Sequence, residues 1–266
     1  MRDLNESEIE RYSRHIILQD IGVEGQERIC AGKVLVIGAG GLGSPVLYYL
    51  AAAGVGEIGI ADGDEVDLSN LQRQILHTEA DIGRAKTASA VEKLSAVNSN
   101  VKFNVYHEFL TAENILGIVK DYDFIIDGTD SFSSKFLIND ACVLAKKPFS
   151  HGGILRFSGQ TMTINPFQSA CYACVFDAPP PSGSVPSCSQ AGILGSVAGM
   201  LGVIQATEAL KFLSGAGAPL YNAILSFDAL TMTFRKALLK RNPRCRICGS
   251  GGISGLSDYE QKVCDL

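Results

Sequence analysis

The sequence lacks the clusters of basic residues that are typical of nucleic-acid-binding proteins. No run of five or more basic residues occurs, and the formal net charge is -5. Such a chain has no basic segment that would bind a phosphate backbone, so a nucleic-acid partner is not expected. An uninterrupted apolar run of membrane-spanning length is also missing, because the most apolar helical stretch, 191–213, contains Ser196, Gln205, Glu208 and Lys211. No contact with a membrane is therefore expected.

A recognisable signal peptide is missing as well, since residues 1–15 are charged and resemble an amphipathic helix. We therefore expect a cytoplasmic location, where thiols stay reduced. Histidine is scarce, and none of the four lies at ligand spacing from another candidate ligand, so histidine is assigned no metal role. Cysteine, by contrast, occurs eight times, and clustered thiols in a reducing compartment indicate metal binding or catalysis before disulfides.

Helices and strands alternate over the first 153 residues. Apolar residues make up 46% of the 266 residues, which is enough for one sizeable domain. The periodicity predicts helices at 5–30, 44–53, 84–97, 114–120 and 133–145, and strands at 33–37, 57–61, 101–106, 123–126 and from Phe149. This alternation predicts an α/β fold with a Rossmann-like, doubly wound parallel sheet, whose ligand crevice lies at the carboxyl ends of the strands.

The pattern changes after Gly153. Residues 160–164 alternate without an intervening helix, and 223–227 and 232–238 form a strand pair, so the C-terminal strands are predicted to be antiparallel. Between them lie a proline-rich loop at 177–190, long enough to have a function, and the helix at 191–213. From residue 249 the chain is rich in glycine and serine and is expected to be a flexible tail.

A glycine-rich loop joins the first strand to the next helix. Gly38, Gly40 and Gly43 form G-x-G-x-x-G, and Asp62 ends the following strand about 20 residues later. Glycines in this pattern also occur in ordinary tight turns. The strand before the loop, the helix after it and the acidic residue together favour nucleotide binding, with Asp62 on a ribose hydroxyl. They do not choose between NAD and ATP.

Polar residues just past Asp62 favour ATP over NAD. Asn70, Arg73 and Lys86 are each ordinary surface residues when taken alone, but a triphosphate needs such groups, whereas a dehydrogenase does not. Asp130 follows another strand at the same crevice. It is either the N-cap of the helix from Ser133 or a ligand for Mg²⁺, which proteins usually hold by one or two carboxylates plus phosphates.

Two C-x-x-C pairs give the second strong signal. Cys171 and Cys174 are separated by 70 residues from Cys245 and Cys248. Two such pairs predict a tetrahedral Cys₄ zinc site that joins distant segments and is structural, because no ligand position stays open. A redox role for a C-x-x-C pair is the weaker alternative.

A further cysteine lies in the proline-rich loop. Cys188 precedes the predicted start of the helix at 191, where the helix dipole favours a thiolate, so it is a candidate nucleophile or an incidental loop residue. Cys30, Cys142 and Cys264 are interpreted as structural or incidental.

The motifs RYSRH, GAGGLGS, DGDEVDLSNLQRQ, DIGRAK, DGTD and PSCSQAG, together with the paired C-x-x-C, resemble the ThiF/MoeB/HesA family. These proteins are bacterial relatives of the ubiquitin-activating enzymes, and the resemblance extends from about residue 11 to residue 248. It implies adenylation of the C-terminal Gly-Gly carboxylate of a ThiS- or MoaD-like, ubiquitin-fold sulfur carrier, with ATP as the substrate accompanied by Mg²⁺, and with pyrophosphate released. A sulfur donor of the cysteine desulfurase or rhodanese type then gives the thiocarboxylate.

The resemblance also implies roles for individual residues. Arg14 reaches the site of the neighbouring protomer, which implies a homodimer. The loop around Cys188 matches the crossover loop over which the carrier tail threads, with a covalent link to the carrier left open. The implied ATP-binding residues, with Asp130 also serving Mg²⁺, are Gly38, Gly40, Gly41, Gly43, Asp62, Ser69, Asn70, Arg73, Lys86, Asp130 and Ser131.

The expected organisation is one adenylation domain at 1–248, followed by the flexible tail at 249–266. The domain divides into N-terminal helices at 5–30, a nucleotide-binding part at 31–153 and a carrier-binding and zinc part at 154–248. Two alternatives stay open, an NAD-dependent oxidoreductase and a non-catalytic scaffold that binds the carrier. The motifs do not choose between thiamine, molybdenum cofactor and other sulfur-dependent pathways.

Overall fold

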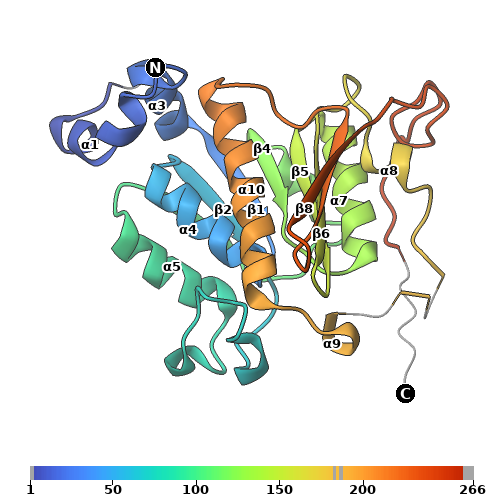
Figure 1. Ribbon diagram of the computed structural model, residues 1–266, viewed down its shortest axis with the longest axis horizontal. Helices are drawn as coiled ribbons and strands as arrows, with labels where there is room; N and C mark the ends of the chain where they lie inside the picture. Colours follow the sequence, from blue (N-terminus) through green and yellow to red (C-terminus); the bar gives the residue numbers. More distant parts are fainter. Residues whose placement is uncertain (1–2, 182–183, 186–187, 260–266) are drawn as a thin grey trace.

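The computed structural model describes the chain except residues 1–2, 182–183, 186–187 and 260–266, and only the backbone of residues 188–189. Within this part, eight strands form one sheet in the order β3-β2-β1-β4-β5-β6-β7-β8 (Figure 1). The strands are β1 Lys33–Ile37, β2 Glu57–Ala61, β3 Lys102–Tyr106, β4 Phe124–Asp127, β5 Phe149–Leu155, β6 Ser158–Ile164, β7 Ala223–Asp228 and β8 Thr233–Leu238. Strands β1 to β5 are parallel and β6 to β8 are antiparallel, so the predicted fold class is confirmed.

Helices cover both faces of the parallel half, because its strands are apolar on both sides. In β1, Val34 and Val36 face one core cluster, while Leu35 and Ile37 face the other. Helices α3 to α5 and α10 cover the first face, and α6 to α8 the second. Figure 1 shows α10 beside α4 across the middle of the sheet. These helices are α3 Gly22–Ala31, α4 Gly43–Ala53, α5 Lys86–Val97, α6 Ile115–Val119, α7 Phe132–Ala145, α8 Tyr172–Val175 and α10 Gly195–Ser214.

The clearest departures from the predicted elements occur at three places. The helix expected over 5–30 is divided into α1 Glu6–Arg11, α2 Ser13–Ile16 and α3, although Asn5 and Glu8 do form the expected capping box. Helix α10 begins at Gly195 rather than at residue 191, because Gly192 has a left-handed φ of 78°. The loop at 177–190 ends in a short helix, α9 Cys188–Ala191.

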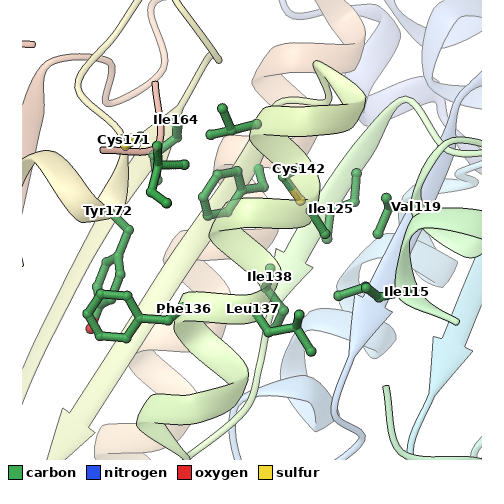
Figure 2. Packing of buried hydrophobic residues seen from close by; sticks show 14 of the residues in the cluster. Ile115, Val119, Ile125, Phe136, Leu137, Ile138, Cys142, Ile164, Cys171 and Tyr172 are labelled. Carbon is green, nitrogen blue, oxygen red and sulfur yellow. The ribbon is translucent and has the colours of Figure 1, made fainter. Parts of the chain in front are cut away.

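The second core cluster lies between α7 and the C-x-x-C segments. Figure 2 shows the ring of Phe136 on α7 against that of Tyr172 on α8, with Cys171 nearby. Part of the segment expected to be a flexible tail also packs here, since the Tyr259 hydroxyl donates to Asp140 at 2.5 Å and the Arg246 guanidinium lies over the Tyr259 ring. In the described part of the chain, no helix is long and apolar enough to cross a membrane.

The chain changes direction between β1 and β4. From β1 it continues outward to β2 and β3, and it returns across the sheet to β4 and β5. The connections after β1 and β4 therefore leave their strands toward opposite faces, and a crevice opens between them at the carboxyl ends. The glycine-rich loop follows β1 and residues 128–131 follow β4, so both lie at this switch point.

Candidate active site and metal centre

A cavity of about 310 Å³ lies at the switch point. We call it the switch-point cavity. It brings together the glycine loop after β1, the acidic residue after β2 and the loop after β4, as their positions at the carboxyl ends predict. The predicted site residues that line it are Gly38, Gly40, Gly41, Asp62, Arg73, Lys86, Asp130 and Ser131.

The glycine loop is held in shape by Asp62. Its carboxylate accepts the backbone N–H of Ala39 at 2.7 Å and that of Asp64 at 2.9 Å. Gly38 has a φ of 95°, which favours glycine. A Cβ at Gly43 would overlap the carbonyl oxygen of Gly38, so Gly43 serves the close turn into α4 and does not line the cavity. Gly40 and Gly41 are half-buried and line the cavity.

Two cations lie on the cavity wall. Lys86 opens α5 and is buried, and its Nζ donates to Asp64 at 2.8 Å. Arg73 donates to the carbonyl oxygen of Ser69 at 2.9 Å, so its guanidinium is steadied by the short 3₁₀ helix Leu68–Asn70. Both groups face the same space as the glycine loop, which is the arrangement that a polyphosphate requires.

The loop after β4 carries Asp130 and Ser131. Asp130 is exposed and lines the cavity, and in the described residues its carboxylate has no hydrogen-bond partner. The N-cap of α7 is Ser131, whose hydroxyl accepts the N–H of Ser134 at 3.1 Å. The alternative that Asp130 caps this helix is therefore wrong, and its carboxylate is available for another role.

Behind this loop lies a buried cluster of charged groups centred on Asp127. The carboxylate accepts from Lys135 Nζ at 3.1 Å, from His151 Nδ1 at 2.9 Å and from the Thr129 hydroxyl at 2.7 Å. Lys135 Nζ also donates to the carbonyl oxygens of Thr129 and Gly152. The cluster thus ties the end of β4 to α7 and β5, and it fixes the loop that presents Asp130.

Protonation in this cluster follows from burial and from the neighbouring charges. Burial by itself raises the pKa of Asp127, but the Lys135 ammonium and the His151 hydrogen bond lower it to about 2. Burial lowers the pKa of His151, so its imidazole is neutral near pH 7. Because Asp127 is ionised and can only accept, the imidazole proton lies on Nδ1.

A second cavity, of about 970 Å³, extends from the first across the antiparallel part of the sheet. We call it the sheet groove. Its floor is formed by cross-strand rows on one face, such as Gly153, Gln160, Ser226 and Arg235, which follow the pairing of β5 to β8. The two cavities share the wall residues Arg73, Thr129, Asp130, Ser131 and Ile154.

Three predicted residues, Ser69, Asn70 and Arg14, lie elsewhere. Ser69 and Asn70 belong to the 3₁₀ helix beside Arg73 and are hydrogen-bonded around Asp67, so they support the cavity without lining it. Arg14 is exposed on α2, away from both cavities of this protomer. Cys188 begins α9, but its side chain lies outside the described part of the chain, as does all of Cys264. The nucleotide, carrier and covalent roles of these residues stay predictions.

The four cysteines of the C-x-x-C pairs gather as predicted. All four sulfur atoms lie within 4.8 Å of one another, and three of the pairs are 3.5 to 3.8 Å apart. Tetrahedral coordination with Zn–S bonds of about 2.3 Å places the sulfurs about 3.8 Å apart. Hydrogen bonds from Cys171 and Cys248 lower the pKa of Cys174. The cluster can hold a metal ion such as Zn²⁺, and it connects α8 to the loop at residues 245–248.

The family model described as the ThiF family matches residues 12–247. The chain belongs to the ThiF family. The predicted family resemblance is therefore confirmed, over a segment that includes both cavities and three of the four clustered cysteines, with Cys248 directly after its end.

Several named proteins are similar to this ThiF-family chain over nearly its whole length. The sulfur carrier protein adenylyltransferase of Thermus thermophilus is 46% identical, and the match covers 95% of this chain and 96% of that protein. The adenylyltransferase and sulfurtransferase MOCS3 of Anopheles gambiae is 44% identical over 97% of this chain but only 59% of its own length. The probable adenylyltransferase/sulfurtransferase MoeZ of Mycobacterium tuberculosis is 44% identical, with 66% of its length covered.

Solved structures share the fold. The E. coli MccB structure superposes with a TM-score of 0.83 at 23% identity, covering 97% of this chain and 77% of that chain. E. coli MccB with MccA-N7isoASN gives a TM-score of 0.82 at 24% identity, covering 92% and 76%. At these identities the likeness concerns the fold, and it agrees with the parallel-then-antiparallel sheet of this ThiF-family chain.

Sequence analysis missed the buried cluster of charges. Asp127 was recognised only as the end of a strand, and His151 was given no role because no second ligand lies near it in the sequence. One signal was present, since Lys135 interrupts the otherwise apolar core face of the helix FSSKFLIND. A lysine at such a position requires a buried anionic partner, and the residues 127–130 supply the nearest candidates.

We expect Asp127 to dominate the acid sensitivity of this part of the fold. Its folded pKa of about 2 lies below the ordinary 3.8, so its stabilising contribution is complete above about pH 4 and is lost as the pH falls toward 2. The shift corresponds to roughly 2 kcal/mol of unfolding free energy. Denaturant unfolding at several pH values should show this extra loss in the wild type but not in Asp127→Asn. Parallel pH curves for the two proteins would contradict the assignment.

We expect Cys245→Ser to lose most of the bound metal. The variant removes one of the four thiolates, and its Tm should fall by roughly 5 °C or more, because the two chain segments are no longer joined. Metal analysis of the purified protein is the measurement. Cys142→Ala is the matched control, because Cys142 is buried but lies outside the sulfur cluster, and it should keep its metal. Full metal content in Cys245→Ser would refute the assignment.

Proposed function

We propose that this chain adenylates the C-terminal carboxylate of a ubiquitin-fold sulfur carrier protein ending in Gly-Gly. One observation carries the proposal: the switch-point cavity and the sheet groove meet at Arg73 and Asp130. One cavity has the features of a nucleotide site and the other is an open trough. A reaction that joins a nucleotide to a long, thin substrate needs two such spaces with a shared wall.

The nucleotide part rests on four groups in the switch-point cavity. The loop at Gly40 and Gly41 leaves room for a phosphate chain, Asp62 lies where a ribose hydroxyl is bound in this fold, and Arg73 and Lys86 supply positive charge. Relatives named as adenylyltransferases favour ATP over NAD at this site. Their names equally favour an enzyme over the alternative of a non-catalytic scaffold.

The carrier part rests on the sheet groove. An extended peptide fits a trough that runs over a sheet face and ends at the cations of the first cavity. The two cavities meet beside Arg73, where a Gly-Gly end needs the least room because it has no side chains. The globular part of the carrier then stays outside, over the antiparallel strands.

The reaction needs no general base from the protein. The carrier carboxylate is ionised near pH 7, and one of its oxygens attacks the α-phosphorus of ATP. The bond between the α-phosphorus and the bridging oxygen breaks, and pyrophosphate leaves with the electron pair. Arg73 and Lys86 reduce the repulsion between the two anions and stabilise the charge that develops on pyrophosphate, so positioning and electrostatics supply the catalysis.

Two metal ions are part of the proposal. Asp130 fits Mg²⁺, because its carboxylate is exposed at the junction of the cavities and has no partner among the described residues. Mg²⁺ bound there with ATP supplies charge neutralisation of the phosphates. Zn²⁺ fits the Cys₄ cluster, and its part is structural, since four thiolates leave no open position.

The further partners and the organisation follow from the same proposal. A sulfur donor of the cysteine desulfurase or rhodanese type would convert the acyl adenylate to a thiocarboxylate, and a cytoplasmic location agrees with the free thiols. Residues 1–248 would form one adenylation domain, with nucleotide at 31–153 and carrier at 154–248. A homodimer is supported by exposed Arg14 and by Ile17 and Leu18 beside it, which are 68% and 50% exposed.

The first measurement is ATP–pyrophosphate exchange with each Gly-Gly-ending carrier encoded by the same genome. Exchange that depends on a carrier would establish the adenylation. Exchange with one carrier and not with another would also identify the pathway as thiamine, molybdenum cofactor or a third synthesis. A folded, metal-loaded protein that gives no exchange with any carrier would refute the proposal.

We expect Arg73→Ala to lower the carrier-dependent exchange rate by about 100-fold or more, because a charge at the reacting phosphates is lost. Arg84→Ala is the matched control. Arg84 is an arginine of the same segment that pairs with Asp81 and Glu92 at the surface, and its loss should change the rate by less than about twofold. Normal exchange by a folded Arg73→Ala enzyme would remove Arg73 from the site.

We expect Arg14 to act in the site of the neighbouring protomer. Arg14→Ala and Asp130→Ala should each be inactive, whereas a mixture should recover about a quarter of the wild-type activity after random subunit exchange, since one site of each heterodimer is intact. Exchange assays before and after mixing are the measurement, with each variant mixed with itself as control. No recovery despite proven subunit exchange would exclude an action in trans.

A further inference from the structure

His151 has one ring nitrogen without a partner. The residue lies on β5 and is 1% exposed, and its Nδ1 donates to Asp127. Nε2 is buried as well, and it has no hydrogen-bond partner in the described part of the chain. Because the proton lies on Nδ1, Nε2 is a bare acceptor. Such an atom costs free energy unless something donates to it, so its position points to a ligand.

The unpaired nitrogen lies under the floor of the sheet groove. It is 3.4 Å from the point that a Cβ of Gly153 would occupy, and both residues line the groove. Gly153 therefore leaves an opening above Nε2 that any other residue would cover. The Tyr172 ring packs against the imidazole with 4.4 Å between centroids, and Asp127 fixes the opposite side, so the ring cannot turn away.

A second unpaired polar group borders the same opening. Gln160 pairs with Gly153 across β5 and β6, and its Nε2 is 3.6 Å from the same Cβ position. Within the described residues, no hydrogen bond is made by its side-chain amide. His151 therefore offers an acceptor and Gln160 a donor, side by side. That pair complements the N–H and the carbonyl oxygen of one residue in an extended peptide, because these two groups point to the same side of the chain.

The position also excludes other occupants. Phosphate and carboxylate oxygens only accept hydrogen bonds, so neither the phosphate chain of the nucleotide nor the reacting carboxylate satisfies Nε2. His151 on β5 is paired with Asp127 on β4, and Asp127 lies three residues before Asp130. The opening therefore lies at the end of the groove that is nearest the junction of the cavities. The part of a bound peptide that reaches this end of the groove is the last part of its C-terminal tail.

We propose that His151 Nε2 accepts a hydrogen bond from a backbone N–H near the C-terminus of the carrier tail. His151 is thus a tail-binding residue that aligns the carboxylate with the nucleotide, and Gly153 is the opening through which the tail reaches it. This inference rests on the proposed function. It predicts that the site selects for a peptide N–H at one fixed distance from the tail end.

Two variants separate this contact from the structural role of the imidazole. His151→Asn keeps a side-chain N–H for Asp127 and removes the distal acceptor. Gly153→Ala leaves His151 untouched and places a methyl group in the opening, in ordinary contact with its neighbours and at a backbone φ that alanine adopts. Each should raise the KM for the carrier by about 10-fold, with kcat and the KM for ATP changed by less than about twofold. Gly117→Ala, at an exposed position of α6 with open space around it, is the control and should leave all three constants unchanged.

The decisive test changes the substrate instead of the enzyme. Semisynthetic carriers in which an ester oxygen replaces one tail N–H at a time lose a donor without gaining bulk. With wild-type enzyme, the ester replacement at one tail position should raise the KM for the carrier by about 10-fold. With His151→Asn the same replacement should not raise the KM further, because donor and acceptor are then both absent.

The controls distinguish the two ways of failing. In one outcome the wild type exchanges with the unmodified carrier and yet shows no ester position at which the increase in KM depends on His151. That result would refute the tail contact and leave the proposed function standing. The contact would likewise be refuted if Gly153→Ala had an unchanged KM for the carrier. No exchange by the wild type with any unmodified carrier would refute the proposed function, and the contact with it.

Discussion

The site depends on one buried carboxylate, that of Asp127. Its charge is balanced by Lys135 from α7 and shared through hydrogen bonds with His151 from β5 and Thr129 from the adjoining loop. An ionised carboxylate without these partners would be costly in the core. The parallel strand β4, the helix that follows it and the neighbouring parallel strand β5 are therefore held in a single geometry. The loop that carries Asp130 leaves the sheet from this fixed point.

This arrangement places the two cavities side by side. The nucleotide features come from the parallel half, where the chain reverses between β1 and β4. The groove comes from the antiparallel half, where a face without helices is open. Residues 128–131 and Arg73 stand at the border between them. The cluster around Asp127 lies beneath that border, so the same contacts that stabilise the core also fix the distance between the two substrates.

The Cys₄ cluster and the segment at 249–259 stabilise the outer side of α7. Cys171 and Cys174 flank the start of α8, whose Tyr172 packs on both Phe136 and His151. Tyr259 completes this layer through Asp140 and Arg246. A structural metal at the cysteines would thus support the wall of the groove at a distance, by holding the Tyr172 ring against the imidazole.

The sequence by itself determined the local features of this protein. Strands 33–37 and 57–61 were predicted with their observed bounds, because a buried parallel strand is a short apolar run ended by glycine or aspartate. The glycine loop, the C-x-x-C pairs and the change to antiparallel strands were likewise visible, since each depends on residues close together in the chain. The family followed from the order of these motifs.

The tertiary structure alone decided which distant groups meet. Asp127, Lys135 and His151 span 24 residues and three elements, and no periodicity relates them. Gly195, the first residue of α10, approaches the backbone of Gln72 so closely that a side chain there would clash, a contact that no helix signal reveals. The free Nε2 of His151 is likewise a property of the packed fold. Long-range contacts depend on how the strands and helices pack together. The amino-acid pattern specifies that packing only through the sum of many weak packing energies.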